Sequence, residues 1–301
     1  MVLFSLLMVL ICLNACSGAK ISDNVTVYVT TNDRAKDFVR SEIALGDKQA
    51  ASPCVITIDP SVRYQTMDGF GAAVTGSTCY NLMRMAPEDR TAFLKETFSD
   101  TEGMGYSYIR ISIGCSDFSL SEYTCCDTKG VENFALQSEE KEYVIPILKE
   151  ILAISPSIKI LGSPWTCPRW MKVDNLKDLR PFESWTSGQL NPAYYQDYAT
   201  YFVKWIQAME AEGIPITPQN EPLNRGNSAS LFMGWEEQLS FVRDALGPKL
   251  KETGLKTKIY AFDHNYNYDN MLEQQGYPMK IYEDENAASF LTGAAYHNYG
   301  G

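Results

Sequence analysis

The chain has 301 residues, of which 45% are hydrophobic and 21% are charged, a balance typical of a folded protein with a sizeable core. This composition excludes a disordered protein, a coiled coil and a collagen-like fibre. The 37 acidic and 26 basic residues give a formal net charge of −11, which would repel phosphate backbones and argues against nucleic-acid binding.

Residues 1–19 contain no charged side chain and are dominated by an apolar run from Val2 to Leu13. The run is too short to cross a bilayer and has the length of a signal-peptide core. Cys16 follows a small residue at the expected cleavage point and resembles the lipobox cysteine of bacterial lipoproteins, although no Lys or Arg precedes the run. An ordinary secretory signal is the alternative. Both readings predict export, to the bacterial cell envelope or medium, with a lipid on Cys16 as the only membrane attachment.

Six cysteines remain when Cys12 and Cys16 are set aside, and the chain has two histidines, His264 and His297. None of the six cysteines forms a CxxC pair, so no zinc or iron–sulfur spacing is present. We expect most of them to be small buried hydrophobic residues, although export would permit some disulfides. We predict no metal and no organic cofactor.

Two short segments of alternating polarity, Val25–Thr30 and Val55–Ile58, predict strands near the amino terminus. After residue 64, strands alternate with longer helical segments. The predicted strands end near residues 70, 112, 162, 219, 262 and 297. Helices are predicted over residues 87–98, 139–154 with a kink at Pro146, 191–213 and 235–252, and Asn191 with Pro192 marks the start of the third.

Repeated β–α units of 35–60 residues favour an α/β fold with a parallel sheet, either a barrel or a doubly wound sheet. A doubly wound sheet would call for a glycine-rich phosphate loop, and Gly69–Val74 does not continue as GxGxxG. In a (β/α)8 barrel, residues that follow the strands meet at the carboxyl-terminal mouth. Polar and aromatic residues cluster there, at Asp68, Ser116–Phe118, Ser163–Trp165, Asn220–Pro222 and His297–Tyr299. The barrel is therefore favoured.

The stretch Asn220-Glu221-Pro222 follows a predicted buried strand and is the most informative. Pro222 biases the backbone of Glu221 toward an extended conformation, which would aim its carboxyl group into the mouth. Glycosidic cleavage needs a partly protonated carboxyl that gives a proton to the leaving oxygen, and a neighbouring amide can bond the sugar 2-hydroxyl. Alone, the tripeptide is weak evidence, because a loop with a solvated Glu has the same sequence.

Four further motifs accompany this tripeptide in order, at residues 65–76, 108–119, 162–172 and 296–299. Together the five resemble glycoside hydrolase family 30, which includes the glucosylceramidases, over roughly residues 55–301. The resemblance implies a (β/α)8 TIM barrel with a side β-sandwich. It divides the chain into a signal segment (1–19), amino-terminal strands of the sandwich (20–60) and a barrel segment (61–301).

By matching position, Glu221 resembles the acid/base residue of this family and Asn220 its partner that binds the 2-hydroxyl. Asp117 and Trp165 resemble the residues that bind glucose hydroxyls in the −1 subsite. Trp165 has an alternative role as a core aromatic. The resemblance thus implies one catalytic carboxyl and three substrate contacts on these four residues.

His297 resembles the histidine at the end of the sixth strand, which adds a substrate contact near the nucleophile. Arg110 resembles the second-strand arginine that braces the nucleophile. The alternative for His297 is a structural histidine, and the alternative for Arg110 is an internal salt-bridge partner. Asp68 and Trp170 look structural and are not assigned to the site.

Family members need a second Glu at the end of the seventh strand, whereas this sequence ends at Gly301, after the sixth predicted strand. Glu283–Glu285 cannot replace it, because they precede that strand. The sequence therefore predicts an amino-terminal fragment with six β/α units, incomplete at its carboxyl end. Such a fragment is expected to be inactive and to aggregate through its open sheet edges.

The predicted function is a retaining β-glucosidic hydrolase whose partner is a β-glucoside or glucan. Asn220–Ser228 resembles the family branch that cuts β-1,6-glucan more than the glucosylceramidase branch. Activity on β-glucosylceramide is the first alternative. A carbohydrate-binding surface lipoprotein without catalysis, and a structural lipoprotein without a ligand, are alternatives of other classes.

Overall fold

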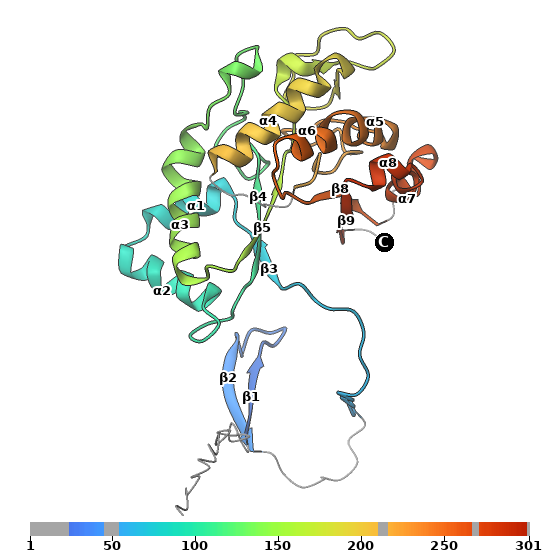
Figure 1. Cartoon of the computed structure of the whole chain (residues 1–301). Coiled ribbons are helices and arrows are strands. Elements are labelled where there is room, and N and C mark those ends of the chain that lie inside the picture. Colours follow the sequence, from blue (N-terminus) through green and yellow to red (C-terminus); the bar gives the residue numbers. More distant parts are fainter. Residues whose placement is uncertain (1–23, 45–53, 210–215, 267–270, 300–301) are drawn as a thin grey trace, which may run out of the picture. The chain divides into compact units, whose positions relative to one another are not determined.

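The computed structural model describes residues 24–44, 54–209, 216–266 and 271–299, in two compact units, Met1–Gln65 and Thr66–Gly301 (Figure 1). The expected signal segment and Cys16 lie outside the described residues. In the first unit, β1 (Asn24–Val29) pairs antiparallel with β2 (Val39–Ala44), and Tyr28 stacks on Phe38 at 4.8 Å between ring centroids. The expected strand over Val25–Thr30 is thus present.

The prediction of a strand over Val55–Ile58 is wrong. These residues have no regular secondary structure, and their apolar side chains are 75–90% exposed. Alternating polarity gives a segment the propensity for a strand, but a strand also needs a partner edge, and no described residue pairs with this one. The strand that pairs with β1 is β2, which the sequence analysis did not predict.

The second unit contains the parallel strands of the predicted barrel. β3 (Gly71–Ala73), β4 (Tyr108–Ser112) and β5 (Lys159–Ser163) are hydrogen-bonded in that order. Ile216 then bridges in parallel to Gly162 and to Ile259, and β8 (Ile259–Asn265) pairs with β9 (Leu291–His297). The described residues therefore supply six consecutive parallel strand positions, as expected for a β/α barrel.

The first of these strands lies later than predicted, because β3 begins at Gly71 instead of ending near residue 70. Asp68 consequently precedes its strand and forms an ion pair of 2.8 Å with Lys159, the first residue of β5. It lies at the amino-terminal end of the sheet, away from the mouth. Its placement supports the structural reading of Asp68.

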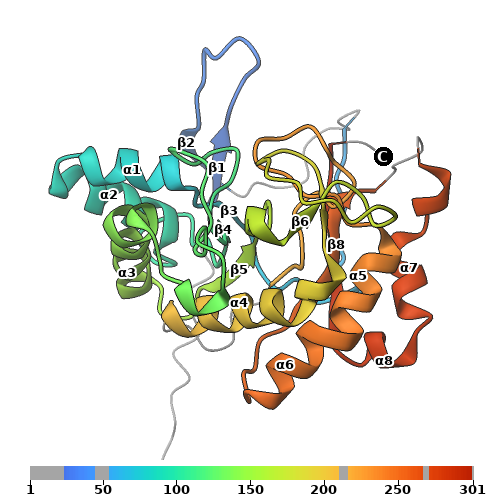
Figure 2. The same ribbon diagram turned by 90° about the horizontal axis from the view of Figure 1, so that it is seen from above.

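The helices of this unit form an outer arc around the strands (Figure 2). They are α1 (Gly76–Arg84), α2 (Pro87–Phe98), η1 (Val131–Asn133), η2 (Glu140–Val144), α3 (Ile145–Ile154), η3 (Arg169–Met171), η4 (Pro192–Tyr194), α4 (Tyr195–Ala208), α5 (Trp235–Phe241), η5 (Val242–Leu246), α6 (Gly247–Glu252), η6 (Leu272–Gln274), α7 (Tyr277–Tyr282) and α8 (Glu285–Ala288). The helix over 87–98 matches its predicted bounds, and the Asn191 side chain accepts a hydrogen bond from the Ala193 N–H, as its cap position predicts. None of the described helices combines the length and hydropathy needed to span a bilayer.

The helices predicted over 139–154 and 235–252 are interrupted by π-helical turns, η2 and η5, each ending two residues before a proline. A proline in a helix lacks an N–H and clashes with the carbonyl four residues earlier, and the wider π turn relieves that clash. The interruption at Pro146 is the predicted kink. Pro248 produces the same effect between η5 and α6, where the sequence reading expected a continuous helix.

The core lies between the strands and α4, whose Tyr198, Tyr201 and Trp205 are fully buried. A Cβ atom on Gly162 would lie 3.0 Å from the Trp205 ring, so a larger residue at this strand position would push the ring by a few tenths of an ångström. Five of the six cysteines are buried and reduced, and Cys54 is exposed, in agreement with the expectation that most are buried.

A short hairpin, β6 (Lys172–Val173) with β7 (Gln189–Leu190), stands in the loop between β5 and α4. Lys172 is 2% exposed, and its ammonium group donates to four backbone carbonyls at 2.8–3.1 Å, those of Ser184, Trp185, Ser187 and Ser230. Because Ser230 belongs to the segment that follows Pro222, this one ammonium group joins two loops.

Candidate functional site

The carboxyl-terminal ends of the parallel strands bring polar side chains together at one place, as the barrel reading predicts. Arg110 comes from β4, Asn220 and Glu221 follow the bridge at Ile216, and His297 ends β9. The structure joins all four through direct hydrogen bonds or one shared partner. That shared partner is a residue that the sequence reading did not select.

Asp263, on β8, is this shared partner and is 2% exposed. Its Oδ2 accepts hydrogen bonds from the Arg110 guanidinium at 2.8 Å, the Ser163 hydroxyl at 2.7 Å and the Thr217 hydroxyl at 2.8 Å. Its Oδ1 lies 2.9 Å from Nε2 of His297. A signal for it exists in the sequence, since Asp263 directly follows the fifth predicted strand, where the other strand ends carry site residues.

The charge of Asp263 is fixed by this environment. Burial alone would raise the pKa of its carboxyl, but Arg110 and His297 outweigh burial and hold that pKa far below its usual range. The backbone at Asp263 has a φ of 69°, in the left-handed region that costs a non-glycine residue free energy. The set of hydrogen bonds on its side chain holds this conformation in place.

Glu221 lies next to Asp263, and both of its carboxylate oxygens have partners. Oε1 lies 3.3 Å from Nδ1 of His297, and Oε2 accepts hydrogen bonds from the side-chain amides of Asn224 at 2.7 Å and Asn227 at 2.8 Å. Its φ of 44° is left-handed, so the expectation of an extended backbone at this position is wrong. The reason is tertiary, because the Glu221 N–H donates to the Asp263 carbonyl at 2.9 Å.

The imidazole of His297 is therefore held between two carboxylates. Burial lowers its pKa, but the hydrogen bonds with Asp263 and Glu221 outweigh burial and raise the pKa to about 9. The hydrogen bond with His297 is likewise the main cause that lowers the pKa of Glu221 to about 2. At neutral pH the free site thus holds an imidazolium between two ionised carboxyl groups.

Arg110 connects this acidic group to Asn220. One guanidinium nitrogen donates to Asn220 Oδ1 at 2.7 Å as well as to Asp263. The guanidinium also lies 4.8 Å from the centroid of the Trp165 ring, within the range of a cation–π contact. The internal salt bridge that was the alternative prediction for Arg110 is present, with Asp263, and it lies within the candidate site itself.

Asp117 and Trp165 lie beside the cluster. Burial raises the pKa of Asp117, and the charge of Glu221 adds to that effect, while Arg110 and Trp165 act in the opposite direction. Trp165 is 8% exposed and packs with Cys115 and Tyr123. The ring therefore combines a position at the site with substantial burial, so its removal would also cost packing.

Glu221, His264 and His297 have donor atoms that all lie within 4.8 Å of one another, a grouping that can hold a metal ion. The raised pKa of His297 favours its protonated form, which cannot bind a metal, and its two nitrogens already face carboxylates. The donor set therefore fits an ion pair better than a metal, and the absence of a metal cofactor stays a prediction.

A cavity of about 310 Å³ adjoins the cluster between β4–β5 and the end of β9. Arg110, Asp263 and His297 contribute its polar wall, and Leu161, Ala295 and Tyr296 are among its other lining residues. A concave space with convergent charged and hydrogen-bonding groups on one side is the usual form of a site for a small polar ligand.

Residues 67–301 match the model of the Glycosyl hydrolase family 30 TIM-barrel domain, which identifies the β/α sheet as part of a TIM barrel. The chain belongs to glycoside hydrolase family 30. The resemblance inferred from the five sequence motifs is therefore confirmed.

Three relatives give this membership more detail. The chain is 35% identical to an endo-1,6-β-D-glucanase of Neurospora crassa over 81% of its own length and 50% of the relative's. It is 30% identical to the lysosomal acid glucosylceramidase of Mus musculus, covering 86% of this chain and 52% of that one. A solved endo-β1,6-glucanase structure is 67% identical, with a TM-score of 0.85 over 92% of this chain and 61% of that chain. The chain thus spans about half the length of the curated relatives it matches.

Proposed function

We propose that this chain provides the acid/base half of a retaining β-glucosidic hydrolase that cleaves β-1,6-glucan. The observation that carries the proposal is the Glu221 carboxylate, oriented by two amides and His297 at the carboxyl ends of the strands. Similarity at 67% identity to a solved endo-β1,6-glucanase supports the choice of linkage. No metal or organic cofactor is needed, because retention requires two carboxyl groups alone.

In this mechanism Glu221 gives a proton to the leaving oxygen and later takes one from water. That work needs a carboxyl whose pKa is raised, whereas the surroundings of Glu221 lower its pKa to about 2. A nucleophilic carboxylate about 5–5.5 Å away would raise the pKa again by charge repulsion. We assign that nucleophile to a seventh strand of the barrel, braced by Arg110.

We assign the substrate contacts as the family resemblance implies. Arg110 holds Oδ1 of Asn220, which leaves the amide Nδ2 to donate to the sugar 2-hydroxyl. In this proposal Asp117 and Trp165 bind other glucose hydroxyls in the −1 subsite, and His297, which lines the 310 Å³ cavity, is a further contact there.

Activity on β-glucosylceramide is the second candidate, and similarity to the mouse glucosylceramidase at 30% identity favours it. A full-length enzyme that releases glucose from glucosylceramide and leaves β-1,6-glucan intact would reverse the order of the two substrates. A non-catalytic carbohydrate-binding protein would bind glucan and turn over neither substrate.

The variant Glu221→Gln tests the acid/base role in the full-length enzyme. Hydrolysis of glucosides with poor leaving groups should fall by about 10²–10⁴, since general acid catalysis contributes that much. Substrates with an activated phenol leaving group should lose far less, because they need little proton donation. Equal loss on both kinds of substrate, or no loss, would contradict the role.

Two wider assignments accompany this function. We assign β1 and β2 to a side β-sandwich, in keeping with their antiparallel pairing. We also assign the protein to the exported fraction of a bacterial cell, with a lipid on Cys16, on the strength of the apolar run over residues 2–13. Membrane association that survives Cys16→Ser unchanged would refute the lipid anchor.

A further inference from the structure

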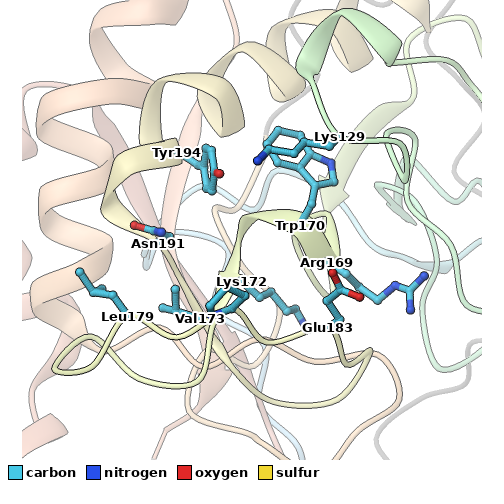
Figure 3. Close-up of a pocket in the computed structure, with 10 residues that line it drawn as sticks. Lys129, Arg169, Trp170, Lys172, Val173, Leu179, Glu183, Asn191 and Tyr194 are labelled. Carbon is cyan, nitrogen blue, oxygen red and sulfur yellow. The ribbon is translucent and has the colours of Figure 1, made fainter.

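A second cavity, of about 210 Å³, lies in the loops that follow β4 and β5 (Figure 3). Its lining residues include Lys129, Trp170, Lys172, Glu183, Asn191 and Tyr194. We call it the Trp170 cavity. Because both loops follow the carboxyl ends of strands, the cavity opens on the same side of the barrel as Glu221. None of its lining residues belongs to the proposed catalytic site.

Two aromatic rings form the apolar part of the cavity. Trp170 and Tyr194 meet edge to face, with ring centroids 5.1 Å apart, and both remain partly exposed. The indole N–H of Trp170 donates to the Cys126 carbonyl at 2.8 Å, which fixes the orientation of the ring. A fixed aromatic ring at an open cavity offers the flat apolar surface on which the C–H face of a sugar packs.

The charges around these rings are balanced. The Lys172 ammonium is occupied by four backbone carbonyls, and the Arg169 guanidinium stacks on Trp185 at 4.4 Å. Lys129 and Glu183, both exposed, then contribute one charge of each sign, and neither forms an ion pair with another described residue. Asn191 uses its Oδ1 to cap the following helix, which leaves its amide N–H groups. One cation, one anion and an amide suit a neutral ligand with many hydroxyl groups better than an anion.

We propose that the Trp170 cavity binds a single glucosyl unit of a glucan chain whose cleaved bond lies at Glu221. This inference rests on the proposed function. The volume is below the roughly 300–1,000 Å³ of pockets for drug-sized ligands, which suits one sugar ring. A polymer held at two places on one face gains affinity through effective concentration, whereas a short glucoside that fills the catalytic cavity gains nothing.

The test compares polymer binding with turnover of a small substrate in the full-length protein. Soluble β-1,6-glucan is the polymer, an aryl β-glucoside the small substrate, and affinity electrophoresis the binding measurement. We expect Trp170→Ala, and separately the double variant Lys129→Ala/Glu183→Ala, to weaken polymer binding about tenfold, the loss of one good contact. Turnover of the aryl glucoside should not change. The double variant alters only exposed side chains, which contribute little to folding. It therefore still tests the cavity if Trp170→Ala fails to fold.

Lys177→Ala is the matched control, because Lys177 is an exposed lysine in the same loop that does not line the cavity. Asp117→Ala should instead lose turnover of the aryl glucoside. Polymer binding by the double variant equal to that of Lys177→Ala would overturn the cavity proposal and leave the proposed function standing. Binding of a sulfated glucan with none of the neutral polymer would also overturn it. Failure of the wild-type protein to bind or cleave any β-glucan would overturn the proposed function as well.

Discussion

Two buried charges, Asp263 and Lys172, each gather four hydrogen-bond partners, yet they differ in the nature of those partners. Asp263 faces the cations Arg110 and His297, and its pKa falls far below its usual range. Lys172 faces neutral carbonyl groups, and burial lowers its pKa to about 8. At Lys172 the neutral carbonyls do not outweigh the effect of burial on the pKa, whereas at Asp263 the two cations do. The first arrangement keeps a charge permanently beside the proposed reaction centre, and the second holds two loops together.

Removing the charge of Asp263 should have the largest effect. Asp263→Asn leaves Arg110 and His297 without their common counter-ion, and breaking a buried ion pair costs about 3–5 kcal/mol. We expect this loss in the free energy of unfolding measured with urea. Asp68→Asn, which alters the exposed ion pair with Lys159, is the control and should change stability very little. Equal stability of the two variants would show that the Asp263 cluster contributes nothing to the fold.

Lys172→Met tests the other half of the comparison. At pH 7 the variant should be less stable by about 1–3 kcal/mol, because the carbonyls that Lys172 contacts lose their donor. The pKa of Lys172 is about 8 in the folded state against 10.5 in the unfolded chain, so between these values the unfolded state binds more protons. The advantage of the wild type should therefore grow as the pH rises from 8 to 10.5. An advantage that shrinks over this range would contradict the lowered pKa.

His297 should show the opposite dependence on pH. Its pKa is raised to about 9 in the folded state from 6.5, so its stabilising contribution is complete below pH 6.5 and is lost as the pH rises through 9. The difference in unfolding free energy between wild type and His297→Gln should fall by about 1–2 kcal/mol over that range, allowing for solvent screening. A constant difference from pH 6 to 10 would mean that the imidazolium is not shared by the two carboxylates.

Predictions from the sequence were correct where a local rule and the tertiary structure agree. Asn191 caps its helix, Pro146 interrupts one, and the strand ends at Ser112 and His297 fall where the pattern put them. The family motifs likewise identified Arg110, Asn220, Glu221 and His297, whose contacts the structure brings together, although the roles assigned to these residues stay predictions.

The sequence failed where distant contacts decide the outcome. The segment Val55–Ile58, predicted as a strand, has no strand partner among the described residues, and β2, which was not predicted, pairs with β1. The backbone of Glu221 departs from the preference imposed by Pro222, because the Asp263 carbonyl binds its N–H. Asp263 follows a predicted strand end, as other site residues do, but its role as the shared partner depends on four residues that lie 34 to 153 positions away.

The two amides on Oε2 of Glu221 have a consequence for where a proton can reside. Since Asn224 and Asn227 occupy Oε2 with donors, a proton on Glu221 must sit on Oε1, the oxygen that faces Nδ1 of His297 at 3.3 Å. A proton that moves from Nδ1 of His297 to Oε1 of Glu221 both protonates the carboxyl group and leaves Nδ1 without its hydrogen. This transfer leaves the net charge of the cluster unchanged. The proton belongs to the Glu221–His297 pair, and the pH profile of any reaction here would report the titration of the pair.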